Sequence, residues 1–264
     1  MELASLASGS SGNAFIVDSG EGLILLDDGI SYRSLQAELE SLGHSCDEIR
    51  AVLLTHEHAD HISGLPVFMK HRPGVPVFAS YGTYDGLSRE KMFPRLTKSA
   101  FELIRPYERF NVCGLDLTPV PTSHDTEGSL AYRGDKDGCS FAVITDLGCW
   151  NEELAGSMEC LSVICLEANH DLHMLEAGPY PYPLKLRIGS GNGHLSNDDA
   201  AALLIRLWHP GLKEVLLTHL SHENNYPDLA IQTMLSELKS RGIDTEAVPI
   251  TAAPRKGASH IIHF

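Results

Sequence analysis

A short run of histidines directly after an apolar stretch restricts the fold of this chain more than any other feature. Residues 55–61 read Thr-His-Glu-His-Ala-Asp-His, which places three imidazoles and an aspartate close together. The preceding stretch, Ala51–Leu54, is typical of a buried strand, so the histidines follow its carboxyl end, where α/β sheets place ligand sites. Neutral imidazole and carboxylate groups suit zinc, and also manganese or iron. The segment therefore predicts a metal site rather than a histidine-rich turn exposed to solvent.

Three further ligand-type side chains also follow apolar stretches of the chain. His124 comes shortly after residues 115–120, Asp146 follows Val143-Ile144-Thr145, and His219 follows 215–218. Each stretch reads as a strand, so each side chain is expected at a strand end. The convergence of four strand ends on one site favours a functional metal centre over a chance cluster of histidines.

The pattern H-x-H-x-D-H at residues 56–61 resembles the signature of the metallo-β-lactamase superfamily. This resemblance implies an α/β fold, the αββα four-layer sandwich, in which two mixed sheets are flanked by helices. The chain shows no linker of low complexity, so we expect one domain over residues 1–264 with two similar halves. Helical spacing of apolar residues and helix start signals predict helices over 34–42, 62–71, 196–208 and 227–240.

The same resemblance implies a complete set of ligands for two divalent metal ions, zinc or manganese, with iron as a further option. The first ion would be held by His56, His58 and His124, the second by Asp60, His61 and His219, and Asp146 would bridge them. A hydroxide shared by the two ions would be the nucleophile, and Asp60 would accept its proton and orient it.

Two adjacent aspartates follow the apolar stretch 23–26. Asp27 stands at a strand end, where a carboxylate can accept the outer N–H of a ligand histidine. Asp28 is predicted to be a turn residue.

Five segments further resemble the YycJ (WalJ) family of bacterial metallo-β-lactamase-fold proteins. They cover residues 8–13, 166–171, 178–187, 193–197 and 218–225. The resemblance implies a metal-dependent phosphodiesterase that acts as a 5′-to-3′ exonuclease on double-stranded DNA in the bacterial cytoplasm.

Residues around position 194 fit phosphodiester chemistry. His194 lies between a strand-like stretch and a helix start, where it is expected to donate a proton to the leaving oxygen; a purely structural histidine is the alternative. Ser196 and Asn197 are expected to cap the following helix, whose free N–H groups can also bind a phosphate.

Other substrate contacts are expected in two loops and one short segment. The prolines within 178–187 predict a shaped loop at the rim of the cleft, with Lys185 and Arg187 on phosphates and two tyrosines either stacking on bases or packing on the protein. Further substrate contacts are predicted at three polar side chains, which are Ser11, Asn13 and Asn169.

The formal net charge of −15 is unusual for a nucleic-acid enzyme, because phosphate binding draws on basic surface. Local positive charge can outweigh net charge, and basic residues gather at 70–72, at 91, 95 and 98, at 185 and 187, and at 255–256. The alternatives are a small-molecule hydrolase of cyclic phosphodiesters, lactones or thioesters, and an RNA-processing nuclease. The sequence has neither a leader nor a membrane-spanning stretch, so we expect a cytoplasmic protein.

Overall fold

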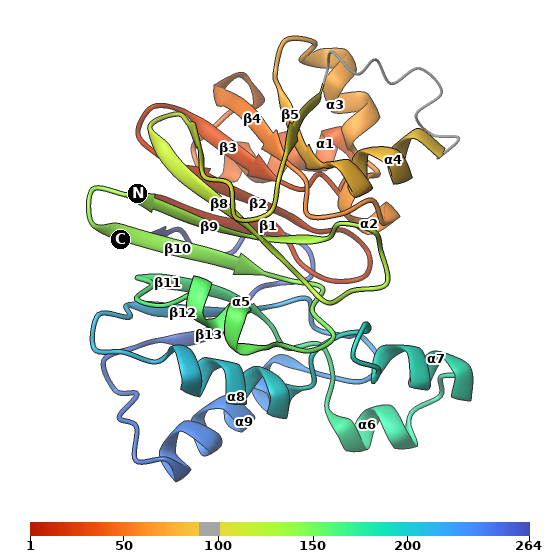
Figure 1. The fold of residues 1–264 in the computed structure, drawn as a ribbon, viewed down its shortest axis with the longest axis vertical. Helices are drawn as coiled ribbons and strands as arrows, with labels where there is room; N and C mark the ends of the chain where they lie inside the picture. Colours follow the sequence, from red (N-terminus) through yellow and green to blue (C-terminus); the bar gives the residue numbers. More distant parts are fainter. Residues whose placement is uncertain (90–100) are drawn as a thin grey trace.

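The fold consists of two sheets packed face to face, with helices on both outer surfaces (Figure 1). A computed structural model describes residues 1–89 and 101–264. The predicted αββα sandwich is therefore confirmed. Three of the basic residues noted above, Lys91, Arg95 and Lys98, lie outside the described residues.

The first sheet belongs to the N-terminal half of the chain, apart from one edge strand. Its order is β14-β1-β2-β3-β4-β5-β6, with antiparallel pairs from β14 to β3 and parallel pairs from β3 to β6. The strands are β1 (Glu2–Ala7), β2 (Ala14–Asp18), β3 (Leu23–Leu26), β4 (Ile49–Leu53), β5 (Val77–Ser80), β6 (Phe101–Ile104) and β14 (Ile262–His263).

The second sheet repeats this arrangement in the C-terminal half. Its order is β13-β12-β11-β10-β9-β8-β7, antiparallel from β7 to β10 and parallel from β10 to β13. The strands are β7 (Phe110–Val112), β8 (Leu115–Pro121), β9 (Leu130–Lys136), β10 (Cys139–Ile144), β11 (Val163–Glu167), β12 (Glu214–Thr218) and β13 (Ile250–Ala252). The two halves therefore share a topology, as predicted.

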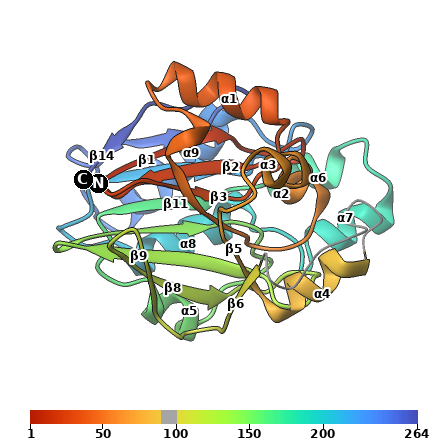
Figure 2. The same cartoon turned by 90° about the horizontal axis from the view of Figure 1, so that it is seen from above.

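Helices cover the outer face of each sheet (Figures 1 and 2). Those beside the first sheet are α1 (Tyr32–Ser41), α2 (Ala59–Ile62), α3 (Leu65–His71) and α4 (Tyr81–Arg89), with a 3₁₀ turn, η1 (Cys46–Glu48). Those beside the second are α5 (Glu152–Ser157), α6 (Leu172–Ala177), α7 (Tyr182–Ile188), α8 (Asn197–Leu207) and α9 (Pro227–Ser240).

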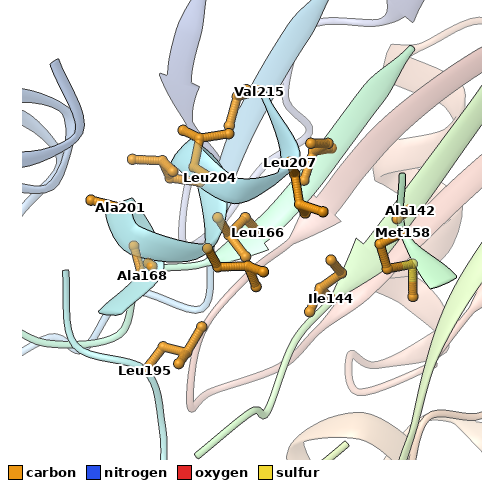
Figure 3. Packing of buried hydrophobic residues seen from close by; sticks show 14 of the residues in the cluster. Ala142, Ile144, Met158, Leu166, Ala168, Leu195, Ala201, Leu204, Leu207 and Val215 are labelled. Carbon is orange, nitrogen blue, oxygen red and sulfur yellow. The ribbon is translucent and has the colours of Figure 1, made fainter. Parts of the chain in front are cut away.

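The core has three layers because the central strands are apolar on both faces. Along β3, Leu23 and Leu25 pack toward the helices of the first half, whereas Ile24 and Leu26 pack between the two sheets. This alternation follows from the two-residue period of a strand. The third layer joins α5, α8 and α9 to the second sheet, where Leu204 lies over the strand that carries Leu166 (Figure 3). Burial of these faces fixes the strand ends relative to one another.

Two predicted elements differ from the structure. The structure has two helices where one was expected over 62–71. Helix α2 begins inside the histidine segment and ends at Ile62, and α3 begins at Leu65 after the two residues Ser63 and Gly64. The segment 178–187 was expected to be a loop, which is wrong, because its second half forms α7. Pro181 is the N-cap of that helix and Pro183 lies in its first turn. Proline is tolerated at these positions because their N–H groups have no partner within the helix.

Within the described ranges, no helix is both long and apolar enough to cross a bilayer.

Candidate metal centre

The predicted metal ligands follow the carboxyl ends of four strands, and two of them, Asp60 and His61, lie in the short helix α2. The segment after β4 carries the first histidines, His124 follows β8, Asp146 follows β10 and His219 follows β12. Because the two sheets pack face to face, these ends meet at one end of the sandwich, near α2 (Figures 1 and 2).

Three of the residues after strands have an unusual backbone conformation. Asp27, Asp146 and His219 have φ angles of 58°, 53° and 55°, in the left-handed region that few side chains adopt. The turn redirects each chain sharply at the strand end and aims the side chain into the centre. Such strain persists only where the surroundings fix it, and it gathers at functional sites.

The first group of ligand atoms is formed by His56, His58 and His124. His124 Nε2 lies 3.3 Å from His58 Nδ1, and its other nitrogen, Nδ1, donates to the Gly193 carbonyl at 3.0 Å. That hydrogen bond fixes the ring, so Nε2 is free to bind a metal ion. His56 is fully buried, and its Nε2 has no hydrogen-bond partner among the described residues.

The second group is formed by Asp60, His61 and His219. Asp60 Oδ2 lies 3.7 Å from His61 Nε2 and 3.6 Å from His219 Nε2. Each histidine is held from behind by a carboxylate, since His61 Nδ1 donates to Asp27 Oδ2 at 2.7 Å and His219 Nδ1 to Glu167 Oε1 at 3.1 Å. The structure thus places Asp27 where the sequence analysis expects it.

Asp146 lies between the two groups. Its Oδ2 is 3.2 Å from His61 Nε2, while its Oδ1 is 3.7 Å from His124 Nε2 and 3.8 Å from His219 Nε2. Thr145 Oγ1 donates to Oδ2 at 2.7 Å and fixes the carboxylate. The carboxylate therefore lies within 4 Å of ligand nitrogens from both groups, as a bridging ligand requires.

The donor set fits two divalent cations. His56 Nε2 and His219 Nε2 are buried without a hydrogen-bond partner in the described chain, and a buried nitrogen of this kind is costly unless it coordinates. Burial lowers the pKa of His56, which keeps it neutral as a ligand must be. Burial alone would also lower the pKa of His219, but Asp146, Asp60 and Glu167 raise it to about 10, so metal binding there releases a proton.

Comparisons with known proteins agree with this geometry. The Beta-lactamase superfamily domain matches residues 23–220, a range that includes every ligand described above. Exodeoxyribonuclease WalJ of Streptococcus pneumoniae serotype 2 is 34% identical over 256 residues, covering 94% of this chain and 95% of the relative. This chain belongs to the WalJ/YycJ group of the metallo-β-lactamase superfamily. Exodeoxyribonuclease YycJ of Bacillus anthracis is 29% identical over 237 residues, covering 90% of this chain and 89% of the relative.

Solved structures of metallo-β-lactamase-fold proteins also resemble this fold. The metallo-β-lactamase fold protein YhfI of Bacillus subtilis gives a TM-score of 0.70 at 16% identity and covers 98% of both chains. As a member of the superfamily, this WalJ/YycJ-type chain is a hydrolase whose fold uses divalent metal ions.

His194 stands beside both groups of ligands and is linked to them by a residue that the sequence analysis missed. Its Nδ1 donates to Glu167 Oε1 at 2.7 Å, and its ring centre lies 5.3 Å from that of His124 and 5.1 Å from that of His219. Glu167 is fully buried and contacts His194 and His219 through the same oxygen. Because Nδ1 is engaged, Nε2 is the nitrogen left for a substrate.

Glu167 remains ionised in this setting. Burial alone would raise its pKa, but His194 and His219 lower the pKa to about 2. A signal was available in the sequence, since Glu167 is the lone acid at the end of the apolar strand β11, like the other residues of the site.

A pocket of about 180 Å³ opens beside His194 and His219. Arg187 from α7 lines it and donates Nε to Asp125 Oδ2 at 2.6 Å, while Asp125 Oδ1 lies 3.6 Å from His58 Nε2. Asp125 was not predicted, and it connects a basic side chain at the rim to a metal-ligand histidine. Lys185 donates to the Glu176 carbonyl at 2.6 Å and is not among the residues that line this pocket.

Asn13 and Asn169 lie beside the ligands. Asn13 Nδ2 is 3.0 Å from His61 Nε2 and 3.4 Å from Asp60 Oδ2. Asn169 Nδ2 donates to the His219 carbonyl at 2.9 Å, and Asn169 also lines the pocket. Both amides therefore position ligand residues, and Asn169 also borders the space for a substrate.

Two of the predicted substrate contacts, Ser196 and Asn197, have side chains that are used within the protein. Ser196 Oγ caps α8 by accepting from Asp199 N at 3.0 Å, and Asn197 exchanges amide hydrogen bonds with Asn225. Both side chains are buried with their partners inside the protein, and a role for this helix start in substrate binding stays a prediction. Ser11 is exposed and faces a different pocket, on the other side of the loop that ends at Asn13.

The prediction that Asp28 is an ordinary turn residue is also wrong. Asp28 is fully buried, and neither carboxyl oxygen has a hydrogen-bond partner in the part of the chain that the structure describes. Burial and the neighbouring Asp27 raise its pKa to about 8, so the group is largely neutral at pH 7.

Replacing Gly29 with alanine is expected to disturb the metal centre. A Cβ at this position would lie 1.7 Å from the Asp60 carbonyl oxygen and 2.7 Å from Asn13 N, so the backbone that carries Asp60 must move. We expect a loss of about 1–3 kcal/mol in the free energy of unfolding, together with weaker metal binding. Urea unfolding and metal titration measure both quantities. Gly74→Ala is the control, because a Cβ there meets nothing within 4 Å; equal effects of the two changes would contradict the prediction.

Proposed function

We propose that this chain is a metal-dependent phosphodiesterase that removes nucleotides from duplex DNA ends in the 5′-to-3′ direction. The observation that carries the proposal is the position of His194, whose free Nε2 borders the pocket next to two groups of metal-ligating side chains. A phosphodiester needs charge neutralisation and a proton for its leaving oxygen, and this arrangement can supply both. The names of the WalJ and YycJ relatives, both exodeoxyribonucleases, support the choice of substrate.

Two divalent ions in this centre would neutralise phosphate charge and lower the pKa of a water molecule. Asp60 lies beside His61 and His219, where its carboxylate can accept a proton from that water and hold its orientation. His194 can donate a proton from Nε2 to the leaving oxygen, because Glu167 accepts from Nδ1 and fixes the ring. The residues thus divide into a group that orients the nucleophile and a group that assists the leaving oxygen.

Helix α7 supports nucleic acid as the substrate. Arg187 keeps its Nη groups available while Nε is held by Asp125, so its fork can contact a phosphate in the pocket. Tyr182 and Leu186 on the same helix are exposed, at 72% and 56%, and suit contact with an unstacked base. A basic side chain next to exposed apolar surface is the composition expected where a nucleic-acid end is held.

The deciding test is digestion of a duplex labelled at either its 5′ or its 3′ end, with manganese or zinc, beside the His61→Ala variant. Stepwise loss from the 5′ end that disappears in the variant is the expected result, because His61 Nε2 belongs to the second group of ligand atoms. Shortening from the 3′ end would show that the proposed 5′-to-3′ direction is wrong. If only RNA or a small ester such as a lactone is hydrolysed, DNA is the wrong substrate class.

A further inference from the structure

A second pocket, of about 390 Å³, lies outside the metal centre. It is enclosed by the loop between β1 and β2, the start of α1 and the segment around Arg255. Neither the metal ligands nor His194 line it. The mechanism above leaves this pocket without a role.

The pocket and the metal centre share a wall that is one backbone layer thick. Gly29 lines the pocket, and a Cβ built on it would lie 1.7 Å from the Asp60 carbonyl oxygen. Asn13 N donates to that same carbonyl at 2.8 Å, and Gly29 N donates to the Asn13 carbonyl at 2.9 Å. Gly12, the neighbour of Asn13, also lines the pocket. A ligand in the pocket therefore lies next to the residues that hold the second metal group.

The lining is polar and carries two cations. Arg255 and Lys256 form no ion pair within 4.0 Å with any carboxylate of the described residues. Arg255 Nη2 donates to the Leu220 carbonyl at 3.0 Å, which fixes the guanidinium beside the pocket. The acid in the lining, Glu38, is engaged by the backbone N–H of Ala258 at 2.9 Å. Four serines also line the pocket. Ser63 Oγ donates to the Gly29 carbonyl at 2.8 Å, and Ser31 Oγ and Ser34 Oγ are hydrogen-bonded to each other at 2.8 Å, whereas the Ser11 side chain is exposed.

Arg255 and Lys256 differ from the other described cations without a carboxylate partner in sharing the lining of one pocket, in a chain with a net charge of −15. A single cation exposed to water needs no partner, but two cations in one concave wall, with the Ser11 hydroxyl beside them, suit an anion. Phosphate offers several acceptor oxygens and matches a guanidinium, an ammonium and hydroxyl donors together.

We propose that this pocket is a second phosphate site, which binds the nucleic-acid strand one or two nucleotides from the phosphodiester at the metal centre. The inference rests on the proposed function. Ser11 is two residues from Asn13, so their Cα atoms are at most about 7 Å apart, while Asn13 Nδ2 lies 3.0 Å from His61 Nε2. Phosphates of one strand recur about every 3.4 Å along the axis of a duplex. The pocket is therefore within reach of a neighbouring phosphate of the same strand.

The first test measures binding of the metal-loaded protein to a duplex with phosphorothioate linkages over a range of salt concentrations. Lys256→Gln is expected to weaken binding by roughly fivefold, the upper range for an exposed charge pair. It should also lower the slope of log K against log salt by about 0.9, the value for one phosphate contact. Ser11→Ala is a second variant that keeps the charge and should weaken binding without changing the slope. The control is Lys239→Gln in the last turn of α9.

The second test identifies the phosphate. Neutral methylphosphonate linkages are placed one or two nucleotides from the scissile bond, and binding is measured with the wild type and with Lys256→Gln. If Lys256 contacts that phosphate, the losses from the two changes are less than additive. Fully additive losses at both linkages, or a Lys256→Gln protein equal to Lys239→Gln, would overturn the proposal.

A failure of the proposed function gives a different result. If the wild type neither binds the duplex nor hydrolyses bis(p-nitrophenyl) phosphate, the phosphodiesterase assignment fails first. If the wild type does both and the Lys256 and Ser11 variants bind the duplex as it does, only the second phosphate site is wrong.

Discussion

Replacing Asp146 with asparagine is expected to reduce phosphodiester hydrolysis by more than about 100-fold, since changes one shell further from a metal already cost 10- to 100-fold. Its carboxylate lies between the two groups of ligand atoms, with Oδ2 3.2 Å from His61 Nε2 and Oδ1 3.7 Å from His124 Nε2. The amide has the same shape but lacks the negative charge that a ligand between two cations supplies. We expect one metal ion to be lost or bound weakly, which metal analysis of the dialysed protein measures together with the rate.

Asparagine is a more informative replacement than alanine at this position, because the backbone conformation suits asparagine better. Asp146 has a φ of 53°, which asparagine adopts more readily than alanine does. Asp146→Ala would add a conformational cost of about 1–2 kcal/mol, so its loss of activity mixes folding with chemistry. Asp116→Asn on β8, whose side chain is 45% exposed, is the matched control. Unchanged activity and metal content in Asp146→Asn would remove the two-metal arrangement.

Much of this site could be predicted because its residues obey a local rule. An apolar strand is followed at once by a histidine or an aspartate, and the strand ends meet because two apolar faces of each sheet are buried. His56, Asp146 and His219 follow this rule within three residues of a strand end, and the structure brings them together. The fold could be predicted from the same pattern. Strands and helices that alternate without a linker can pack into only a few arrangements of layers.

The parts that escaped prediction depend on tertiary contacts. Asp125 and Arg187 meet across 62 residues, and only the position of α7 brings them together. The prolines around α7 favour a loop in isolation but also fit a helix start, and packing decides between these two outcomes. Asp28 looks like a turn residue because its neighbours are polar or glycine, yet the chain buries it behind α2 and α3, where Gly64 approaches its carboxyl group.

Replacing Glu167 with glutamine is expected to affect both the acid and the metal centre, because one carboxylate oxygen holds two imidazoles. Glu167 Oε1 accepts from His194 Nδ1 at 2.7 Å and from His219 Nδ1 at 3.1 Å, while Oε2 accepts from Leu147 N at 2.7 Å. Glutamine has one acceptor oxygen, so its NH₂ group must face an N–H group on one side. Metal affinity should fall by about 10- to 100-fold, as for other residues that orient a ligand.

The same change should also slow the reaction when metal is saturating. Loss of a positioned general acid costs about 10²- to 10⁴-fold, and the change removes the carboxylate that fixes the His194 ring through Nδ1. Glu176→Gln on α6, an exposed glutamate, is the control. A Glu167→Gln protein with the metal affinity and rate of this control would show that the buried carboxylate only supports packing.

Two substrates that differ in their leaving group can distinguish a general-acid role of His194 from a structural role. A p-nitrophenolate leaves without a proton, whereas the alkoxide of a DNA strand needs one, so Glu167→Gln and His194→Asn should slow DNA cleavage much more than bis(p-nitrophenyl) phosphate hydrolysis. A purely structural defect would slow both substrates equally. Because the two residues act as a unit, the double variant should cleave DNA about as fast as the slower single variant. Losses that multiply in the double variant would mean that Glu167 acts through His219 and the metal centre rather than through the acid.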